Sequence, residues 1–309
     1  MEAKRFSIII PVYNRSDCIL RCLNSVISQV YKSYEIIVID DGSNDNTLKL
    51  IETNYGMSKY IKLIHYTDNK GVNFARNRGI EQANGEYIIF LDSDDQLVND
   101  SLSNIDSFIL QNPGYMHYLF LVSDRKGDPI LPKSLYEYNY QDWLSEKVTG
   151  DFLHIIQPSC FEGLPFIEEF RIYESLNWYR IIRKNKKQLY IPWIAVDRER
   201  GRKDSATKEA TLNNKISLRN TYNYLNIFIN WYKNDYIHFG LKIYLNKKIK
   251  TAILIGLSIN EINKNRDLIK LLPKSLERFT FSILNFKLFG PITYFLFLGY
   301  TYLKRTLLG

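Results

Sequence analysis

Cysteine is scarce in this sequence of 309 residues, which contains only Cys18, Cys22 and Cys160. Three cysteines make no disulfide framework, and no C-x-x-C pair offers a metal site. The first residues, MEAKRFSIIIPVYN, contain an apolar run that is too short for the core of a secretory signal. We therefore expect the protein to work in the reducing cytoplasm.

Two glycine-rich phosphate-binding signatures are also missing. No G-x-G-x-x-G follows the first predicted strand, and no G-x-x-x-x-G-K-[ST] occurs in the sequence. Their absence excludes a dinucleotide fingerprint and a P-loop nucleotidase. The composition, 45% hydrophobic and 24% charged, is ordinary for a folded protein with one large core or two modest ones.

Acidic residues are rare in the last third of the chain. Residues 213–309 contain 15 Lys and Arg against 4 Asp and Glu, whereas residues 1–212 contain 26 against 29. The formal net charge of +8 therefore belongs to the C-terminal third. An anionic partner is expected to bind there.

Strands and helices alternate in the first hundred residues. Unbroken apolar runs at 6–13, 34–41 and 87–91 are typical of strands that are buried on both faces, and 60–66 is a shorter strand. Apolar residues at helical spacing separate them, over 19–30, 48–55 and 72–84. Asn14 is the predicted N-cap of the first helix and Gly85 the C-cap of the third. This order predicts an α/β fold with a mostly parallel sheet flanked by helices.

Carboxylates close two of these strands. The second strand ends at Asp40-Asp41, and DSDD at 92–95 follows the fourth. The carboxyl ends of parallel strands meet at one sheet edge, where open α/β sheets bind ligands. Acids this close repel one another unless a cation lies among them, and oxygen ligands suit Mg²⁺ or Mn²⁺, which would hold a diphosphate. The alternative for DSDD is an acidic turn or a helix cap.

Four motifs carry a family resemblance. PVYN at 11–14, DDGSNDNT at 40–47, KGVNFARNRGI at 70–80 and FLDSDD at 90–95 resemble the signatures of inverting family 2 glycosyltransferases of GT-A fold. The resemblance implies a Rossmann-like domain whose first half, 1–112, binds a nucleotide-diphosphate sugar and whose second half, 113–211, binds the acceptor. A basic helical region follows at 212–309. The implied reaction moves a sugar, expected from a UDP-sugar, to a hydroxyl of a glycan or lipid-linked acceptor in bacterial surface polysaccharide assembly.

Matching positions imply the residues of the donor site. Tyr13 and Asp41 would contact the base or ribose, and Arg76 would lie near the diphosphate. Asp92 and Asp94 would form the DxD metal site, with Asp94 the principal ligand. The remaining implied contacts to the nucleotide sugar are Pro11, Asn14 and Ser93, and Asp95 is expected to support the metal site. For Arg76 the alternative is a surface helix residue that pairs with a nearby acid.

The second half is expected to carry the general base. In the family the base often lies in a Glu-Asp pair just before a helix, but here the pair reads Glu174-Ser175. We predict Glu174 as the base, with Asp151, near His154, as the alternative. Glu174 could instead only cap its helix. A lone histidine such as His154 is more often a packing residue than a catalyst.

The charged run DRERGRKDS at 197–205 has two interpretations. A solvated loop is the usual structure of such a run. The alternative is a mobile lid whose Arg200 or Arg202 reaches the diphosphate when the lid closes.

The C-terminal third predicts Lys-rich helices and a short apolar segment. Residues 288–303 carry no charge, but Gly290-Pro291 interrupts them. A helix over 291–303 would be about 20 Å long, whereas a hydrocarbon core is about 30 Å thick. We therefore expect peripheral binding to the inner face of the cytoplasmic membrane. The alternatives are packing on the catalytic domain and a homodimer interface.

Two other functions are weighed against the sequence. A nucleotidyltransferase of similar topology would have a Gly-rich phosphate loop after the first strand, and PVYNRSD is not one. Nucleic-acid binding is suggested by the pI of about 9.1. The acids at the predicted crevice would repel a phosphate backbone, so no nucleic-acid partner is expected.

Overall fold

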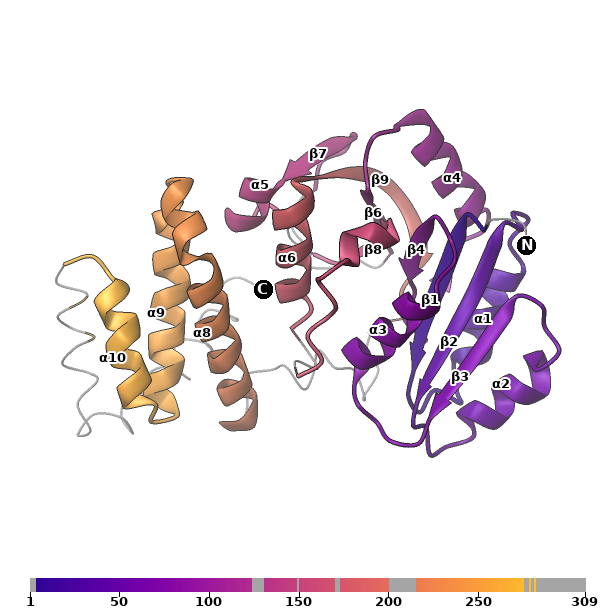
Figure 1. Cartoon of the computed structure of the whole chain (residues 1–309), viewed down its shortest axis with the longest axis horizontal. Coiled ribbons are helices and arrows are strands. Elements are labelled where there is room, and N and C mark those ends of the chain that lie inside the picture. Colours follow the sequence, from indigo (N-terminus) through magenta and orange to yellow (C-terminus); the bar gives the residue numbers. More distant parts are fainter. Residues whose placement is uncertain are drawn as a thin grey trace. The chain divides into compact units, whose positions relative to one another are not determined.

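The computed structural model describes residues 4–123, 131–148, 150–169, 173–199, 215–274, 278 and 281. The chain divides into two compact units, Met1–Trp143 with Val148–Arg202, and Leu144–Lys147 with Lys203–Gly309 (Figure 1). The predicted boundary at 211/212, the proposed lid residues Arg200 and Arg202, and the apolar segment 288–303 lie outside the described residues. The boundary at 112/113 stays a prediction.

Four parallel strands form the first part of the sheet of the first unit. They are β1 (Phe6–Val12), β2 (Tyr34–Asp41), β3 (Ile61–Tyr66) and β4 (Tyr87–Phe90), in the spatial order β3-β2-β1-β4. The register sets Ile8 beside Ile36 of β2 and Ile89 of β4. All seven residues of β1 are buried, as its unbroken apolar run predicted.

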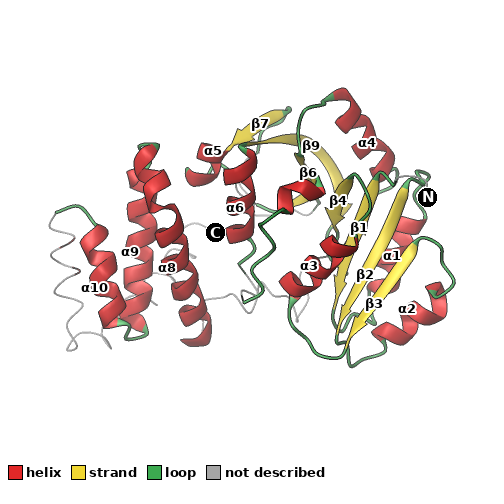
Figure 2. Cartoon of the chain, in the orientation of Figure 1, coloured by secondary structure: helices red, strands yellow, loops and turns green. Residues whose placement is uncertain are grey.

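The sheet continues beyond β4 with mixed pairing (Figure 2). Next to β4 come β8 (Phe152–Ile156), β6 (His117–Val122), β9 (Lys187–Asp197) and β5 (Gln96–Leu97), while β7 (Tyr136–Asn139) pairs with β9. β8 runs antiparallel to β4 and β6, so its amino end lies at the carboxyl edge of β4. The predicted α/β fold with a central sheet and flanking helices is confirmed, and the parallel pairing is concentrated in the first four strands.

Helices cover both faces of this sheet (Figure 1). One face, with Ile8 and Ile10, packs on α1 (Ile19–Ile27) and α4 (Ser101–Gln111) in the main hydrophobic core. On the other face lies α3 (Val72–Gln82), where Gly79 touches the Ile9 side chain. The remaining elements of the unit are α2 (Thr47–Tyr55), α5 (Tyr140–Leu144), the 3₁₀ turn η1 (Pro158–Phe161) and α6 (Ser175–Asn185).

Three local predictions are wrong. α1 begins after Cys18 and ends at Ile27, so Asn14 is not its N-cap, and Val30 is 76% exposed. Asn14 has a positive φ of 50° and bonds to the next loop instead. Gly85 is not the C-cap of α3, which is Ala83. Gly85 approaches β1 so closely that a Cβ would lie 2.5 Å from the Ser7 nitrogen.

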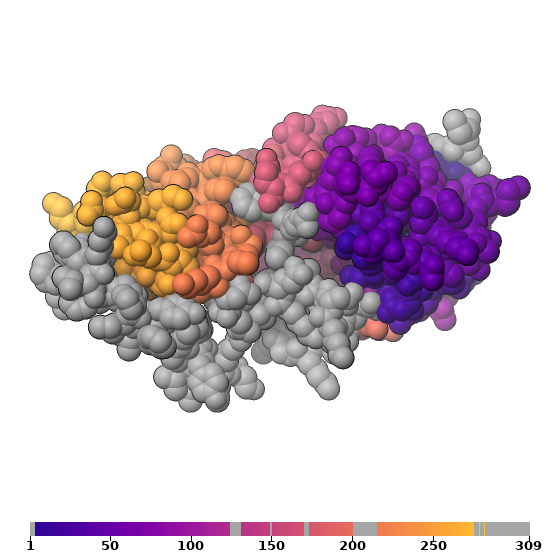
Figure 3. Space-filling view, turned by 90° about the horizontal axis from the view of Figure 1, so that it is seen from below, coloured from indigo at the N-terminus to yellow at the C-terminus, as the bar shows by residue number. Residues whose placement is uncertain are grey.

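The second unit contains the helices α8 (Lys215–His238), α9 (Lys242–Ser258) and α10 (Ile262–Leu271). α9 packs on both others, and the Tyr222 hydroxyl donates to Asn265 Oδ1 (2.9 Å) in their buried interior. In the space-filling view the orange and yellow residues of these helices form one contiguous surface (Figure 3). Within the described ranges, no helix is both long and apolar enough to cross a bilayer.

Candidate active site

The loops that follow β1 and β2 are joined to each other at the carboxyl edge of the sheet. The backbone N–H of Asn14 donates to Ser43 Oγ, and Asn14 Oδ1 accepts the N–H of Asn44, both at 2.9 Å. Tyr13 is exposed beside them. Pro11 lies within β1 opposite Ile39 of β2, beyond the last residue of β1 that pairs with β4, so its missing N–H breaks no bond to β4.

The two acids at the end of β2 are buried and hold loops. Asp41 accepts the backbone N–H groups of Lys70 (3.0 and 3.1 Å) and Gly71 (2.6 Å), at the turn into α3. Asp40 bonds to Ser43 and contacts His65 Nδ1 at 2.9 Å. Their carboxylates therefore fix the loops around the crevice, and a nucleotide contact by Asp41 stays a prediction.

Arg76 is the centre of the site. It projects from α3 and is buried, so its interpretation as a surface residue is wrong. Its Nη2 lies 3.1 Å from Asp92 Oδ1, and its Nη1 pairs with Glu174 Oε1. The guanidinium carbon also lies within 6 Å of the ring centres of Phe90 (5.7 Å) and Phe166 (5.9 Å). Burial opposes the charge, but the carboxylates of Glu174 and Asp92 outweigh it and raise the pKa of Arg76.

The DSDD turn presents its acids to different surroundings. The Asp92 side chain is 53% exposed, Ser93 is buried, and Asp94 is half-buried with its carbonyl oxygen bonded to Arg21 (3.2 Å). Asp95 is buried and accepts the backbone N–H of Glu199 at 3.1 Å. Burial, together with the charges of Asp92 and Asp94, raises the pKa of Asp95 to about 8. A cation beside these groups would relieve this repulsion.

Arg198 is a site residue that sequence reasoning missed. Its Nη1 lies 2.8 Å from Asp151 Oδ2, and its charge acts on Asp95 and Asp92. The ion pair with Asp151 raises the pKa of Arg198, although burial opposes this. Arg198 is placed in the site by the antiparallel pairing of Gln96 with Asp197, which brings the end of β9 beside DSDD. That pairing cannot be read from the charged run alone.

The two candidate bases differ in their neighbours. Glu174 is at the N-cap position of α6, yet its side chain makes no capping bond within the described part of the chain and pairs with Arg76 instead. It is 37% exposed. Asp151 is 68% exposed and pairs with Arg198. Glu174 and Asp92 of the DSDD turn therefore pair with the same guanidinium, that of Arg76, whereas Asp151 pairs with Arg198.

The acids can be tested for their fit to a divalent cation. No group of three or more His, Cys, Asp or Glu side chains placed to hold a metal occurs among the residues that the structure describes. Mg²⁺ commonly uses one or two carboxylates and completes its shell with water and substrate phosphate oxygens. The Asp92 and Asp94 carboxylates on one turn fit that incomplete kind of site.

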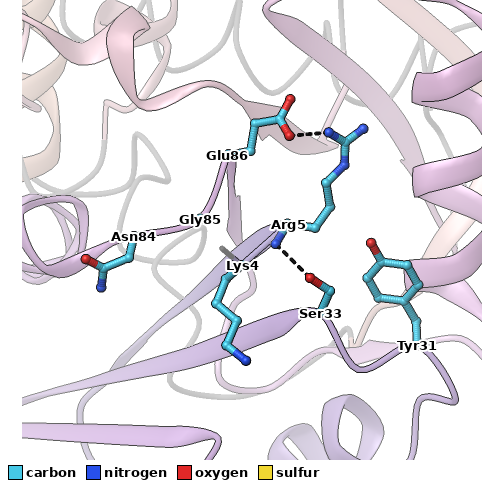
Figure 4. Close-up of a pocket in the computed structure, with 7 residues that line it drawn as sticks. All are labelled: Lys4, Arg5, Tyr31, Ser33, Asn84, Gly85 and Glu86. Carbon is cyan, nitrogen blue, oxygen red and sulfur yellow. Dashed lines mark hydrogen bonds and ion pairs between the residues drawn. The ribbon is translucent and has the colours of Figure 1, made fainter. Parts of the chain in front are cut away.

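A cavity of about 460 Å³ lies at the other end of the sheet, at the amino ends of β1 and β4 (Figure 4). Its lining includes Arg5, which pairs with Glu86 and with Asp106. Open α/β sheets bind ligands at the carboxyl ends of their strands, whereas this cavity lies at the amino ends of β1 and β4. The candidate site remains the acidic edge.

Comparison with known proteins gives a consistent picture. Residues 7–155 match the sequence model described as Glycosyl transferase family 2. An uncharacterised glycosyltransferase of Haemophilus influenzae is 42% identical over 136 residues, which cover 42% of this chain and 52% of the relative. A protein of Campylobacter jejuni named GalNAc(5)-diNAcBac-PP-undecaprenol beta-1,3-glucosyltransferase is 30% identical over 197 residues, 60% of this chain and 62% of the relative. The chain thus spans about half to three fifths of the length of these relatives.

A solved structure supports the fold. The crystal structure of S. aureus TarS 1-349 in complex with UDP-GlcNAc superposes with a TM-score of 0.59 and 18% identity, over 91% of this chain and 79% of that one. At this identity the likeness concerns the fold alone. The GT-A architecture expected from the sequence is confirmed.

Proposed function

We propose that this chain, whose residues 7–155 match the model of glycosyltransferase family 2, acts as a member of that family and transfers a sugar from a nucleoside-diphosphate sugar to an acceptor hydroxyl, with inversion at the anomeric carbon. The observation that carries the proposal is the position of Arg76. One buried guanidinium contacts Asp92 of the DSDD turn and Glu174 before α6. The donor side and the acceptor side of a transfer site would meet at this residue.

The proposed donor is a UDP-sugar, the class of ligand named in the TarS complex. Arg76 would lie beside the diphosphate, because its guanidinium reaches Asp92 in the DSDD turn. Tyr13 and Asp41 would contact the uridine. The further proposed contacts to the nucleotide sugar are Pro11, Asn14 and Ser93. Arg200 and Arg202 would contact the diphosphate if the charged segment 197–205 closes over the site as a lid.

Asp94 and Asp92 would hold Mg²⁺ or Mn²⁺ together with the diphosphate oxygens. When bound, such a cation neutralises charge on the departing diphosphate. Asp95 would support the turn, since it is buried and accepts the Glu199 amide.

Glu174 would act as the general base. It removes the proton of the acceptor hydroxyl while that oxygen attacks the anomeric carbon from the face opposite the diphosphate. The new bond joins the acceptor oxygen to the anomeric carbon, and the bond from that carbon to the phosphate oxygen breaks. The departing diphosphate carries the negative charge, and the proton stays on Glu174. Asp151 is the alternative base.

The proposed acceptor is a lipid-linked glycan in bacterial surface polysaccharide assembly; the name of the Campylobacter relative gives an undecaprenol-linked glycan as the acceptor of that protein. We further propose that the second unit binds the inner face of the cytoplasmic membrane peripherally. Exposed basic residues on or near α9 and α10 support this, because Lys242, Arg266 and Lys274 have no acidic partner within the described ranges. Each basic residue near an anionic surface contributes about 1 kcal/mol.

A substrate panel tests the proposal. The full chain is incubated with Mn²⁺, individual UDP-sugars and undecaprenyl-diphosphate-linked acceptors, and the release of UDP and the glycolipid product are measured. We expect product with at least one donor and little product from E174Q. Product formation by E174Q at the wild-type rate would overturn the assignment of the base, and release of pyrophosphate in place of UDP would indicate a nucleotidyltransferase.

A further inference from the structure

A second polar system in the first unit takes no part in the reaction outlined above. It is a chain of three hydrogen bonds: Trp143 Nε1 to Gln188 Oε1 (2.7 Å), Gln188 Nε2 to His117 Nδ1 (2.7 Å) and His117 Nε2 to His154 Nδ1 (2.8 Å). The four residues come from α5, β9, β6 and β8. Each is more than nine-tenths buried, and His154, at 8%, is the most exposed.

The chemistry of Trp143 fixes the direction of every bond in this chain. An indole nitrogen can only donate, so the oxygen of the Gln188 amide must face it. The Gln188 nitrogen therefore donates to His117 Nδ1, and the ring proton of His117 is on Nε2. His117 then donates to His154 Nδ1, which leaves the ring proton of His154 on Nε2.

Both histidines are neutral in this arrangement. A proton on His117 Nδ1 would point at the Gln188 amide N–H, and a proton on His154 Nδ1 would point at His117 Nε2–H. Two donors cannot share a bond, so protonation of either ring breaks the chain. Burial acts in the same direction, since it lowers the pKa of His117 to about 3 and places that of His154 well below its usual value.

His154 lies next to the candidate active site. Extending the β4–β8 register by one residue places His154 opposite Phe90, so that these two residues lie on the same face of the sheet. Phe90 comes two residues before Asp92. Its ring stacks on Trp178, with centroids 3.7 Å apart and planes inclined by 3°. Trp178 is one turn of α6 after Glu174 and also packs on Phe166, which the Arg76 guanidinium contacts.

We propose that His154 positions the substrate, and that its Nε2–H donates a hydrogen bond to a hydroxyl oxygen of a sugar bound beside Arg76 and Glu174. No hydrogen bond to this nitrogen occurs within the described residues, so the donor remains available to a ligand. The chain from Trp143 through Gln188 and His117 holds the imidazole in this tautomer. The same tautomer excludes His154 as a general base, because Nε2 carries the proton and the lone pair of Nδ1 accepts the hydrogen bond from His117. The inference rests on the proposed function for the identity of its ligand.

The tautomer itself is tested without any substrate. Long-range ¹H–¹⁵N NMR of the full chain labelled at histidine nitrogens distinguishes protonated from unprotonated ring nitrogens. We expect His154 to carry its proton on Nε2 and His117 on Nε2, with both signals unchanged between about pH 5 and 8. A proton on Nδ1 of His154, or titration of His154 in this range, overturns the proposal and leaves the proposed transfer reaction unaffected.

The role in positioning is tested with two amides at one site. The side-chain nitrogen of Gln can occupy the place of Nε2, whereas Asn reaches only the place of Nδ1 and keeps the bond to His117. We expect H154Q to stay close to the wild type, and H154N to lose about tenfold in kcat/KM, the scale of one hydrogen bond. The loss should appear in the KM of the substrate whose sugar His154 contacts. Comparing the KM values of the donor and the acceptor therefore shows which of the two His154 binds. Affinity for UDP alone should be equal in both variants.

Two outcomes overturn this role: equal activity of H154Q and H154N, or an equal loss of UDP affinity and activity in both variants. Unfolding of H154N, seen as a loss of the cooperative thermal transition, would leave the NMR result to decide. A chain inactive with every donor, in which His154 still carries its proton on Nε2, would contradict the proposed function and not the hydrogen-bond chain.

Discussion

The two units of this chain use charge in opposite ways. In the first unit, acids at the sheet edge are held by defined partners, as Asp41 is by two backbone amides and Asp92 by Arg76. In the second unit, residues 215–274 carry 11 Lys and Arg against 3 Asp and Glu. The exposed Lys242 and Arg266 have no acidic partner within the described ranges. A catalytic site requires a few charges in fixed positions, whereas electrostatic attraction to a membrane surface depends on how many charges there are.

The largest effect is expected at the acidic edge. D94N should reduce transfer by at least about a thousandfold, because it removes the principal ligand of the cation that neutralises the departing diphosphate. Steady-state rates with the active UDP-sugar measure this, and circular dichroism checks the fold. D100N, at an exposed acid after the same turn, is the matched control. Near-normal turnover by D94N would end the metal hypothesis.

The next effect concerns the base. E174Q should keep donor affinity and lower kcat by about two to four orders of magnitude, the range for loss of a general base. D151N should lower kcat far less, since Asp151 pairs with Arg198 and not with Arg76, the arginine that contacts the DSDD turn. An active E174Q beside an inactive D151N would move the base to Asp151.

A smaller effect is expected from R76K, which keeps one positive charge but loses the planar fork that reaches Asp92 and Glu174 together. We expect kcat/KM to fall about 10- to 100-fold, with part of the fall in donor affinity. The control is R78K, at an arginine on the same helix that pairs with Glu81 and Glu168. Equal effects of the two substitutions would show that Arg76 has no special part in the site.

The smallest effect on chemistry is expected in the second unit. Replacing Lys242, Arg266 and Lys274 together with Gln should weaken binding to vesicles containing anionic lipid by about tenfold or more, on the basis of about 1 kcal/mol per basic residue. Vesicle sedimentation at low and high salt measures this. Turnover of a water-soluble acceptor should not change. Wild-type sedimentation by the triple variant would contradict membrane docking by these residues.

The first four strands could be predicted from sequence because β1, β2 and β4 contain apolar runs with local turn signals, while β3 is a shorter strand of alternating burial. The positions of Asp92 and Arg76 follow from the same local patterns. The contact of Arg76 with Glu174, and that of Arg198 with Asp151, depend on pairing between segments far apart in the chain. The antiparallel β8 and the short β5 decide that pairing, and a two-residue strand such as Gln96–Leu97 leaves no periodicity to detect.

The hydrogen-bond chain through His117 was beyond sequence reasoning for a similar reason. His117 and His154 are 37 residues apart, and their contact requires the antiparallel register of β6 and β8. His154 alone gave only the general expectation of a packing residue. In the structure it is both packed on Trp178 and joined to His117.

The central claim is that Arg76, Asp92 and Asp94 form a cation-assisted diphosphate site, with Glu174 on its acceptor side. Calorimetric titration of the full chain with UDP, with and without Mn²⁺, tests it most directly. We expect binding that is strengthened by Mn²⁺, lost in D94N and retained in E174Q. Binding of UDP to D94N as tightly as to the wild type, or no binding of UDP by the wild type in the presence of Mn²⁺, would contradict it.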